Sequence, residues 1–225
     1  MGLYIAATPI GNLEDITLRA LRILKEVDLI LAEDTRRTMK LLSHYSIRNR
    51  IDSFNEFNKR RKTPYIISLL KQNKEIAVVS DSGTPGISDP GFYLVRECIK
   101  NGIKVIPIPG ASSVISALVV SGLPTDRFSF FGFIPKKESQ KRKFLEKISG
   151  MDGTIVLFES PHRLIKTLKA MSETAPNFSM VLAREMTKKF EEFTRGSTID
   201  VFNKVKNRKV KGEIVIILNK SSKIE

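Results

Sequence analysis

Three residue types are scarce or missing in the 225-residue sequence, which has one cysteine (Cys98), two histidines and no tryptophan. A single cysteine excludes an internal disulfide framework and fits a reducing compartment. The histidines, His44 and His162, are dispersed, so no metal-ligand spacing is present and we expect no metal-binding residues.

Long apolar runs are also missing. No stretch reaches the roughly 18 apolar residues of a membrane helix, and the N-terminal segment "MGLYIAATPIG" lacks the basic start of a secretory signal. We therefore expect a cytoplasmic protein with no membrane partner. With 41% hydrophobic residues, the chain can bury the core of one large domain or of two small ones.

Acidic residues are outnumbered by basic ones, 24 against 38, which leaves a formal net charge of +14. The basic excess is greater after residue 115, where the positive charges cluster at 135–147 and 204–212, and a further basic run lies at 59–62. Such clusters favour a polyanionic partner, above all nucleic acid. An even spread of lysine for solubility is the alternative that composition leaves open.

Short β-rich runs alternate with segments of helical period, which predicts an α/β protein. We divide it into an N-terminal α/β domain, 1–115, and a C-terminal α/β domain with a mixed sheet, 116–225. Thr17 and Asp89 are the expected N-caps of two helices in the first domain. The expected strands are 3–7, 28–33, 75–80, 104–108, 127–134, 153–159, 178–185 and 212–218, with a further antiparallel strand near 191–195.

Three loops rich in glycine and proline follow strands of the first domain: "AATPIGN" (6–12), "SDSGTPGISDPG" (80–91) and "IPGASS" (108–113). In a parallel sheet all three lie at the carboxyl edge, where open α/β folds bind ligands. Glycine allows close backbone approach and proline stiffens a loop, so the three predict one rigid binding surface. The alternative is that they are only tight turns. Neither a P-loop nor a G-x-G-x-x-G motif is present.

These loops, together with "LARE", "TK" and the late "KGEIVI", closely resemble the tetrapyrrole-methylase-like superfamily of class III methyltransferases. Within it, the sequence is most similar to the enzymes that methylate the ribose 2′-oxygen of a decoding-centre cytidine in 16S ribosomal RNA. The resemblance covers nearly the whole chain. It implies two α/β domains with S-adenosylmethionine in the cleft between them, the small ribosomal subunit as partner, and a homodimer.

The resemblance also implies which residues bind the cofactor, largely through the main chain. Pro9 matches the first cofactor loop, the 82–87 segment matches the loop around the methionine end, and Ser112 and Ser113 follow. Residues of the second domain complete the site, the last four of them over the adenine. The predicted cofactor residues are Pro9, Ser82, Gly83, Thr84, Ile87, Ser112, Ser113, Phe158, Glu159, Ala183, Met186, Gly212 and Glu213.

The sequence departs from the family pattern at two places. Relatives often carry an "H-x-x-H-N" stretch where this chain has "FNEFN" (54–58), so no imidazole role is expected there. Some relatives also continue beyond the "GEIV" strand into a helical appendix, whereas this sequence ends at Glu225. RNA contacts made by such an appendix are expected to be dispensable or replaced by the basic clusters.

The segment "AEDTRRT" (32–38) places carboxylates and guanidiniums after the second strand, at the edge that also carries the loops. A ribose hydroxyl must lose its proton on methylation, so we predict catalytic roles for Glu33 or Asp34 as the base and for Arg36 on the neighbouring phosphate. The alternative is that Asp34 caps the next helix and the arginines are solvated.

Further basic residues are candidates for contact with RNA phosphates. The charges of the 182–196 segment are equally consistent with a solvated edge strand. We expect Phe128, Phe130, Phe131 and Phe133 to pack in the core and His162 to be structural. The predicted RNA-binding residues are Arg36, Arg37, Lys136, Lys137, Lys141, Arg142, Arg184 and Lys188.

The sequence is compatible with three functions. The first is a ribosomal RNA methyltransferase, which the loops, the net charge and the resemblance favour. The second is a methylase of the same superfamily that acts on a small tetrapyrrole or a protein side chain, which the basic charge disfavours. The third is a non-catalytic RNA-binding protein of ribosome assembly.

Overall fold

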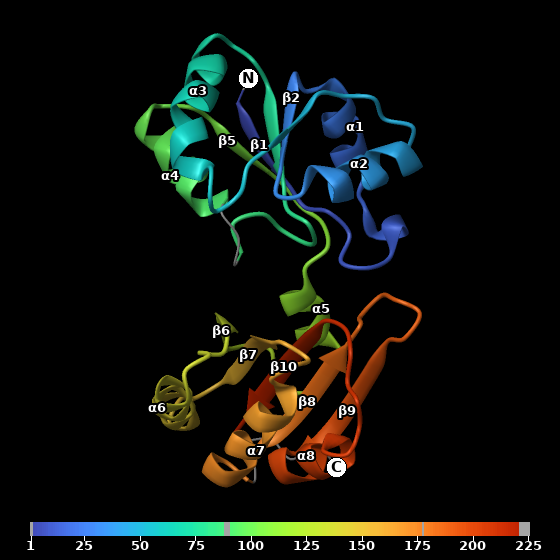
Figure 1. The fold of residues 1–225 in the computed structure, drawn as a ribbon, viewed down its shortest axis with the longest axis vertical. Coiled ribbons are helices and arrows are strands. Elements are labelled where there is room, and N and C mark those ends of the chain that lie inside the picture. The colour runs from blue at the N-terminus through green and yellow to red at the C-terminus, as the bar shows by residue number, and fades with distance from the viewer. Residues whose placement is uncertain (1, 88–90, 177, 221–225) are drawn as a thin grey trace. The chain divides into compact units, whose positions relative to one another are not determined.

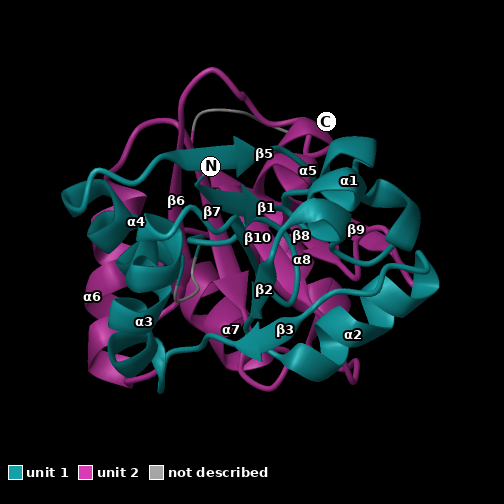
Figure 2. Ribbon diagram, turned by 90° about the horizontal axis from the view of Figure 1, so that it is seen from above, with its two compact units in different colours: residues 1–112 teal, residues 113–225 magenta. Residues whose placement is uncertain are grey.

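The computed structural model describes residues 2–87, 91–176 and 178–220. The chain forms two compact units, 1–112 and 113–225 (Figure 2), which divide close to the boundary predicted after residue 115. The expected cap Asp89 lies outside the described residues.

The first unit contains a five-stranded sheet in the order β3-β2-β4-β1-β5, and all its strand pairs are parallel (Figure 1). The four strands expected in this half are present, and β3 is an additional three-residue edge strand without the apolar run that would have predicted it. The strands are β1 (Leu3–Ala6), β2 (Leu29–Ala32), β3 (Ile51–Ser53), β4 (Ile76–Val79) and β5 (Val105–Ile108).

Helices cover both faces of this sheet, which is why its central strands β1, β2 and β4 are apolar on both sides. The helices are α1 (Leu18–Glu26), α2 (Thr35–His44), α3 (Lys59–Lys71) and α4 (Gly91–Lys100), with a 3₁₀ turn η1 at Leu13–Asp15. Figure 2 shows α1 and α2 on one side of the strands and α3 and α4 on the other. One core cluster joins Leu24 and Leu42 to Ile30, and the other joins Ile66 and Leu94 to Leu31.

The connections of this sheet create a switch point between neighbouring strands β1 and β4. The chain leaves β1 towards α1 on one face, whereas it leaves β4 towards α4 on the other face. Ligands of open α/β sheets bind where successive connections diverge in this way. The loops after β1 and β4 therefore lie where a fold of this kind binds its ligand.

Side-chain caps set the starts of several helices, and the cap predicted at Thr17 is present. The Thr17 side chain accepts a hydrogen bond from the Ala20 N–H at 3.1 Å and so caps α1. At the start of α8 (Thr198–Val205), in the second unit, Ser197 and Asp200 form a reciprocal capping box. Such caps satisfy backbone N–H groups that have no partner inside the helix.

The second unit contains a mixed five-stranded sheet in the order β6-β7-β10-β8-β9. Strands β6 and β7 are parallel, and the remaining pairs are antiparallel, including the edge strand β9 expected near 191–195. The strands are β6 (Phe128–Phe133), β7 (Thr154–Glu159), β8 (Ser179–Arg184), β9 (Glu192–Ser197) and β10 (Ile214–Asn219).

Four helices accompany this sheet: α5 (Ser113–Val119), α6 (Glu138–Ser149), α7 (Leu164–Thr174) and α8 (Thr198–Val205). Helices α6, α7 and α8 pack on one face, and α5 contributes Val114 and Leu118 to a cluster on the other. The prediction that the phenylalanines of β6 are core residues holds only in part. Phe130 and Phe131 pack against the two clusters, whereas Phe128 and Phe133 are 39% and 59% exposed.

Candidate active site

The loops after β1 and β4 are joined directly to each other at the carboxyl edge of the first sheet. Thr8 and Gly83 exchange two backbone hydrogen bonds, of 2.9 and 3.1 Å, which form an isolated antiparallel bridge. The buried Thr8 hydroxyl donates to the Ser80 carbonyl at 3.2 Å, and the Ser80 hydroxyl donates to the Gly83 carbonyl at 3.2 Å. Both loops are thus held in one conformation at the switch point.

The third loop, after β5, is bound to the other two. The Ala7 N–H donates to the Ile108 carbonyl at 3.2 Å, and the Thr84 hydroxyl donates to the Ala111 carbonyl at 3.3 Å. Gly110 lies so close to the first loop that a Cβ built on it would come within 2.9 Å of the Ala7 Cβ. The structure therefore confirms that the three loops share one edge, and it shows that they form a single hydrogen-bonded unit.

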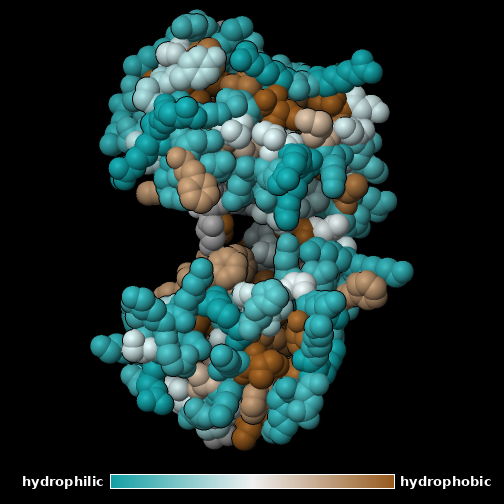
Figure 3. All heavy atoms as spheres, in the orientation of Figure 1, coloured by the Kyte–Doolittle hydropathy of each residue, from teal (hydrophilic) through white to brown (hydrophobic). Residues whose placement is uncertain are grey.

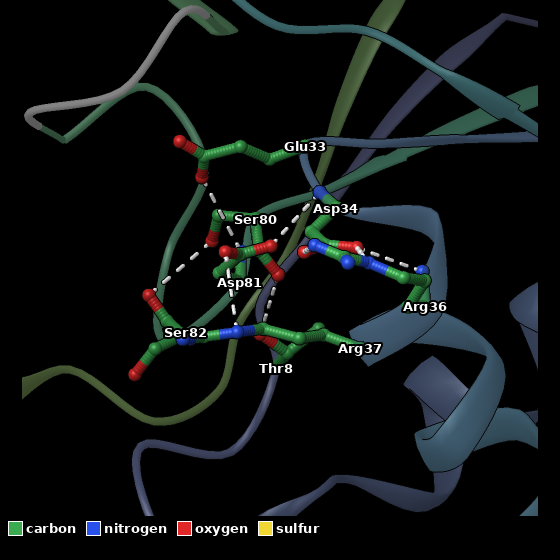
Figure 4. Close-up of polar contacts among 8 residues, drawn as sticks. All are labelled: Thr8, Glu33, Asp34, Arg36, Arg37, Ser80, Asp81 and Ser82. Carbon is green, nitrogen blue, oxygen red and sulfur yellow. Dashed lines mark hydrogen bonds and ion pairs between the residues drawn. The ribbon is translucent and has the colours of Figure 1, made fainter.

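Asp81 joins this unit to the "AEDTRRT" segment, as Figure 4 shows. Its carboxylate accepts the Asp34 N–H at 2.9 Å and lies 3.6 Å from the Arg37 guanidinium, while its own N–H points to the Glu33 carboxylate at 3.5 Å. Sequence reasoning missed Asp81, although it follows a buried strand at the same edge as two arginines. What the sequence did not reveal is that β2 and β4 are neighbours, which brings these charges together.

Asp34 is the N-cap of α2, which is the structural role that the sequence left open as the alternative. Its Oδ1 accepts the Arg36 backbone N–H at 2.9 Å, and its two oxygens accept the Arg36 guanidinium at 3.1 and 2.8 Å. These hydrogen bonds from Arg36 hold the pKa of Asp34 well below its usual range and raise the pKa of Arg36. A carboxylate so firmly paired is a poor proton acceptor at neutral pH, which weighs against Asp34 as the base.

The remaining predicted cofactor residues of the first unit lie on or beside the joined loops. Pro9 directly follows the Thr8–Gly83 bridge and is half-buried, while Ser82 and Ile87 are exposed. Ser112 and Ser113 lie where the β5 loop leads into α5. The segments up to Ser112 that the sequence placed at one edge are thus adjacent in space within this unit, and Ser113 begins the second unit.

In the second unit, the predicted pair Phe158 and Glu159 lies at the end of β7. The Glu159 side chain is fully buried and accepts hydrogen bonds from the Thr167 hydroxyl at 2.6 Å and the Ser160 N–H at 2.6 Å, with the Arg163 guanidinium at 2.5 Å. A carboxylate that is paired in this way and has no exposed surface is not accessible to a ligand. Any cofactor contact by Glu159 is therefore made through its main chain, as the resemblance implies.

The other predicted residues of this unit, Ala183, Met186, Gly212 and Glu213, lie at the joined ends of β8 and β10. Ala183 and Met186 are buried in the cluster that faces α5. Gly212 has a φ of +97°, and a Cβ there would come within 2.4 Å of the Glu185 side chain. Only glycine fits this position without displacing its neighbour.

The predicted RNA-binding residues of the second unit differ in their availability. Lys136, Lys137 and Arg142 are exposed at the start of α6 and on its surface. The side chain of Lys141, by contrast, is only 5% exposed and pairs with Glu138 at 2.8 Å. This burial and the ion pair weigh against contact of Lys141 with RNA, which stays a prediction, because the ammonium group is already engaged by Glu138. Hydrophilic residues predominate on the face drawn in Figure 3.

Arg184 and Lys188 are also held by carboxylates. Arg184 lies 3.0 Å from Glu192, and Lys188 lies 2.9 Å from Glu185 and 3.1 Å from Glu213. Lys188, between two carboxylates, carries little free charge for a phosphate. His162 is exposed just before α7.

The described part of the chain shows neither a metal-binding cluster nor a membrane-spanning helix. No group of three or more histidine, cysteine, aspartate or glutamate side chains there could hold a metal ion. Among the same residues, no helix is both long and apolar enough to cross a membrane.

The sequence matches the family of tetrapyrrole (corrin/porphyrin) methylases over residues 2–201. Among its relatives, a ribosomal RNA small subunit methyltransferase I from Thermotoga maritima is 48% identical over 217 residues, which cover 96% of this chain and 97% of the relative. The protein of the same name from Bacillus subtilis is 43% identical over 223 residues, 99% of this chain and 76% of the relative.

Solved structures with a similar fold are much more distant in sequence. A uroporphyrin-III C-methyl transferase from Thermus thermophilus, complexed with S-adenyl homocysteine, has a TM-score of 0.65 and 19% identity and matches over 98% of each chain. A diphthine synthase has a TM-score of 0.73 and 14% identity, with coverage of 98% of this chain and 90% of the other. By its family match and by its relatives, this chain belongs to the tetrapyrrole (corrin/porphyrin) methylases.

Proposed function

We propose that this S-adenosylmethionine-dependent methyltransferase acts on the RNA of the small ribosomal subunit, at the ribose 2′-oxygen of a decoding-centre cytidine. The observation that carries the proposal is the identity of 43% and 48% with relatives named ribosomal RNA small subunit methyltransferase I, across nearly the whole chain. The net charge of +14 supports a polyanionic substrate. A homodimer and a cytoplasmic location are part of the proposal.

The joined loops of the first unit fit a cofactor held mainly by backbone. Gly83 has a φ of +80° and no Cβ, and Gly110 has no room for one, so both present bare peptide groups at the sheet edge. We assign the cofactor to these loops, through Pro9, the 82–87 segment, Ser112 and Ser113. We also propose the residues predicted in the second unit, which lie at the ends of β7 and β8 and just before β10, as cofactor-binding residues.

When bound, S-adenosylmethionine supplies an electrophilic methyl group on a sulfonium. The ribose oxygen would form its bond to this methyl carbon as the carbon–sulfur bond breaks, and the hydroxyl proton would pass to a base supplied by the protein. Rigid loops serve such an in-line reaction because alignment contributes about 7 to 11 kcal/mol in well-oriented systems. The hydrogen bonds between the three loops provide that rigidity before any ligand arrives.

We assign the base to Glu33 rather than Asp34. Both oxygens of Asp34 are occupied by Arg36. Glu33 lies one residue earlier at the same sheet edge, and the Asp81 N–H points to its carboxylate. Asp34 instead orients Arg36, whose side chain is 86% exposed and keeps donors for a phosphate of the RNA. Arg37, fixed by Asp81, lies on the same turn of α2.

Transfer of tritium from labelled S-adenosylmethionine tests the function. We expect label in small ribosomal subunits or in their RNA, and resistance to alkaline cleavage at a single cytidine, because a 2′-O-methyl group blocks hydrolysis of the adjacent phosphodiester. Label in a tetrapyrrole or a protein would contradict the proposal that ribosomal RNA is the substrate. Tight RNA binding without any transfer would support the non-catalytic alternative.

A further inference from the structure

A groove of about 260 Å³ lies within the second unit, beside β8 and β9, and the proposed reaction gives it no role. Its base is apolar, from Leu182, Val205 and Val210, and its rim carries four cationic side chains and one carboxylate. Arg184, Arg208, Lys209 and Lys211 are the cations, and Glu192 is the carboxylate.

Two loops, 185–191 and 206–213, supply Phe190 and three of the four cations of the groove, and they are joined to each other. Figure 1 shows the course of both loops. The backbone of Glu185 donates to Glu213 at 2.9 Å, and the Glu185 carboxylate accepts the Glu213 N–H at 2.9 Å. Glu185 and Thr187 both have positive φ, 51° and 64°, which an ordinary loop avoids. The hydrogen bonds between the two loops therefore hold the 185–191 loop in a backbone conformation that it would not favour by itself.

The charged side chains are arranged to attract an anion. Glu192 accepts a bidentate pair of hydrogen bonds from Arg208, at 2.7 and 3.0 Å, and a further one from Arg184 at 3.0 Å. One carboxylate thus orients two guanidiniums and neutralises one of them. Lys209 and Lys211 form no ion pair within the described residues, so the groove keeps three positive charges.

Phe190 adds a flat apolar surface to the same groove. It is 64% exposed at the tip of the β8–β9 hairpin, and the Lys189 ammonium lies 5.8 Å from its ring centroid. An exposed aromatic ring among cations is the combination that single-stranded nucleic acid sites use, with bases stacked on the ring and phosphates on the cations. An acidic peptide would use the charges but not the ring.

We propose that this groove binds a single-stranded segment of the RNA substrate, with a base on Phe190 and its phosphates on Arg208, Lys209 and Lys211. The inference rests on the proposed function for the identity of the RNA. It adds a docking site formed by the two loops that also carry Met186, Gly212 and Glu213, the residues assigned to the adenine. Along β8, Arg184 faces the groove while its neighbour Ala183 is buried in the cluster on the opposite face.

The absence of tryptophan from the chain allows a direct test, because Phe190→Trp creates a single fluorescent reporter in the groove. We expect a single-stranded RNA octamer to quench this fluorescence by stacking. The same octamer with abasic sugars should bind without quenching, and a polyglutamate peptide, which can use only the charges, should not quench the fluorescence. Quenching by polyglutamate, or none by RNA, would overturn the proposal.

The contribution of the groove lysines is tested with Lys209→Ala/Lys211→Ala in the Phe190→Trp variant. The control is Lys166→Ala/Lys169→Ala, which removes the same charge from exposed positions of α7. The groove variant should lower the salt slope of octamer binding by roughly 1.4, at about 0.7 per phosphate contact of a single strand. The α7 variant should leave the slope unchanged. Equal slopes in both variants would remove the groove from RNA binding.

A stacking variant completes the test. Phe190→Ala should weaken octamer binding by about 5- to 150-fold, the range of base–aromatic stacking, while thermal unfolding stays at the parent temperature. All these measurements use binding alone, so they are independent of methyl transfer. Octamer binding without transfer to ribosomal RNA would refute the proposed function and keep the groove, whereas transfer without groove binding would do the reverse.

Discussion

Gly83 pairs with the loop after β1 and at the same time has a positive φ, a combination that favours glycine. Its N–H and its carbonyl both form hydrogen bonds with the backbone of Thr8. Its φ of +80° lies in the region that residues with a Cβ rarely adopt. A Cβ at this position would make only ordinary contact with the Ile10 side chain, at 3.4 Å, so the backbone conformation is what requires glycine here. The residue therefore fixes both the loop conformation and the close approach of the loop after β1.

Gly83→Val should abolish S-adenosylmethionine binding while leaving the fold intact. A β-branched residue at positive φ costs about 1 to 2 kcal/mol or more and would shift the joined loops. Gly102→Val is the matched control, because Gly102 has a similar φ of +69° with no atom within 4 Å of its Cβ position. Calorimetric titration should show no measurable affinity in the first variant and parent affinity in the second; equal affinities would displace the cofactor from this loop.

Glu33→Gln should lower the single-turnover rate of methyl transfer by about 10²- to 10⁴-fold, the contribution of a general base. Asp34→Asn should change that rate far less, because asparagine is as good an N-cap and Asp34 is already paired with Arg36. Cofactor affinity should be unchanged in both. A greater fall in rate for Asp34→Asn than for Glu33→Gln would return the role of base to Asp34.

Among the elements, α4 carries the single cysteine on its buried side. Cys98 is fully buried against the first sheet, and desolvation raises the pKa of its thiol to about 11 from 9.0. Because the thiolate is the reactive form, burial and the raised pKa both protect this residue.

Labelling of Cys98 by a thiol reagent should therefore be slow in the folded protein and should become fast in urea. The sign of the pH effect follows from the raised pKa: the unfolded chain loses this proton first, so the stability contribution is complete below pH 9 and declines as the pH rises towards 11. Stability curves of the parent and of Cys98→Ala at pH 8 and 10 isolate this decline. Rapid labelling of the folded protein at pH 8 would show that α4 opens readily.

At the start of α6, three basic residues are exposed and one, Lys141, is buried. Lys136→Glu/Lys137→Glu/Arg142→Glu should weaken RNA binding and flatten its salt dependence by roughly 0.7 to 0.9 for each phosphate that the protein no longer neutralises. Lys141→Glu should instead lower the unfolding temperature, because it places a carboxylate in a buried position beside Glu138. Filter binding across a salt series and thermal unfolding distinguish the two outcomes. An unchanged salt slope in the triple variant would make α6 an ordinary solvated helix.

For the molecule as a whole, the family, the α/β fold class and the methyltransferase activity predicted from the sequence are confirmed by the relatives and by the two sheets. Most strands were predictable because buried parallel strands are short apolar runs, as at Ile76–Val79. The cofactor and catalytic residues stay predictions, with the edge position of Gly83 and Glu33 in their favour.

The sequence by itself determined what depends on local pattern: the apolar strands, the Thr17 cap, the glycine-rich loops and the basic excess. Only the tertiary structure decided what depends on which strands are neighbours and on what each side chain meets. It placed Asp81 between Asp34 and Arg37, it buried Lys141, and it gathered Phe190 and Arg208 around one groove. The physical reason is that pairing and burial arise between residues far apart in the chain, where sequence periodicity carries no information about distance.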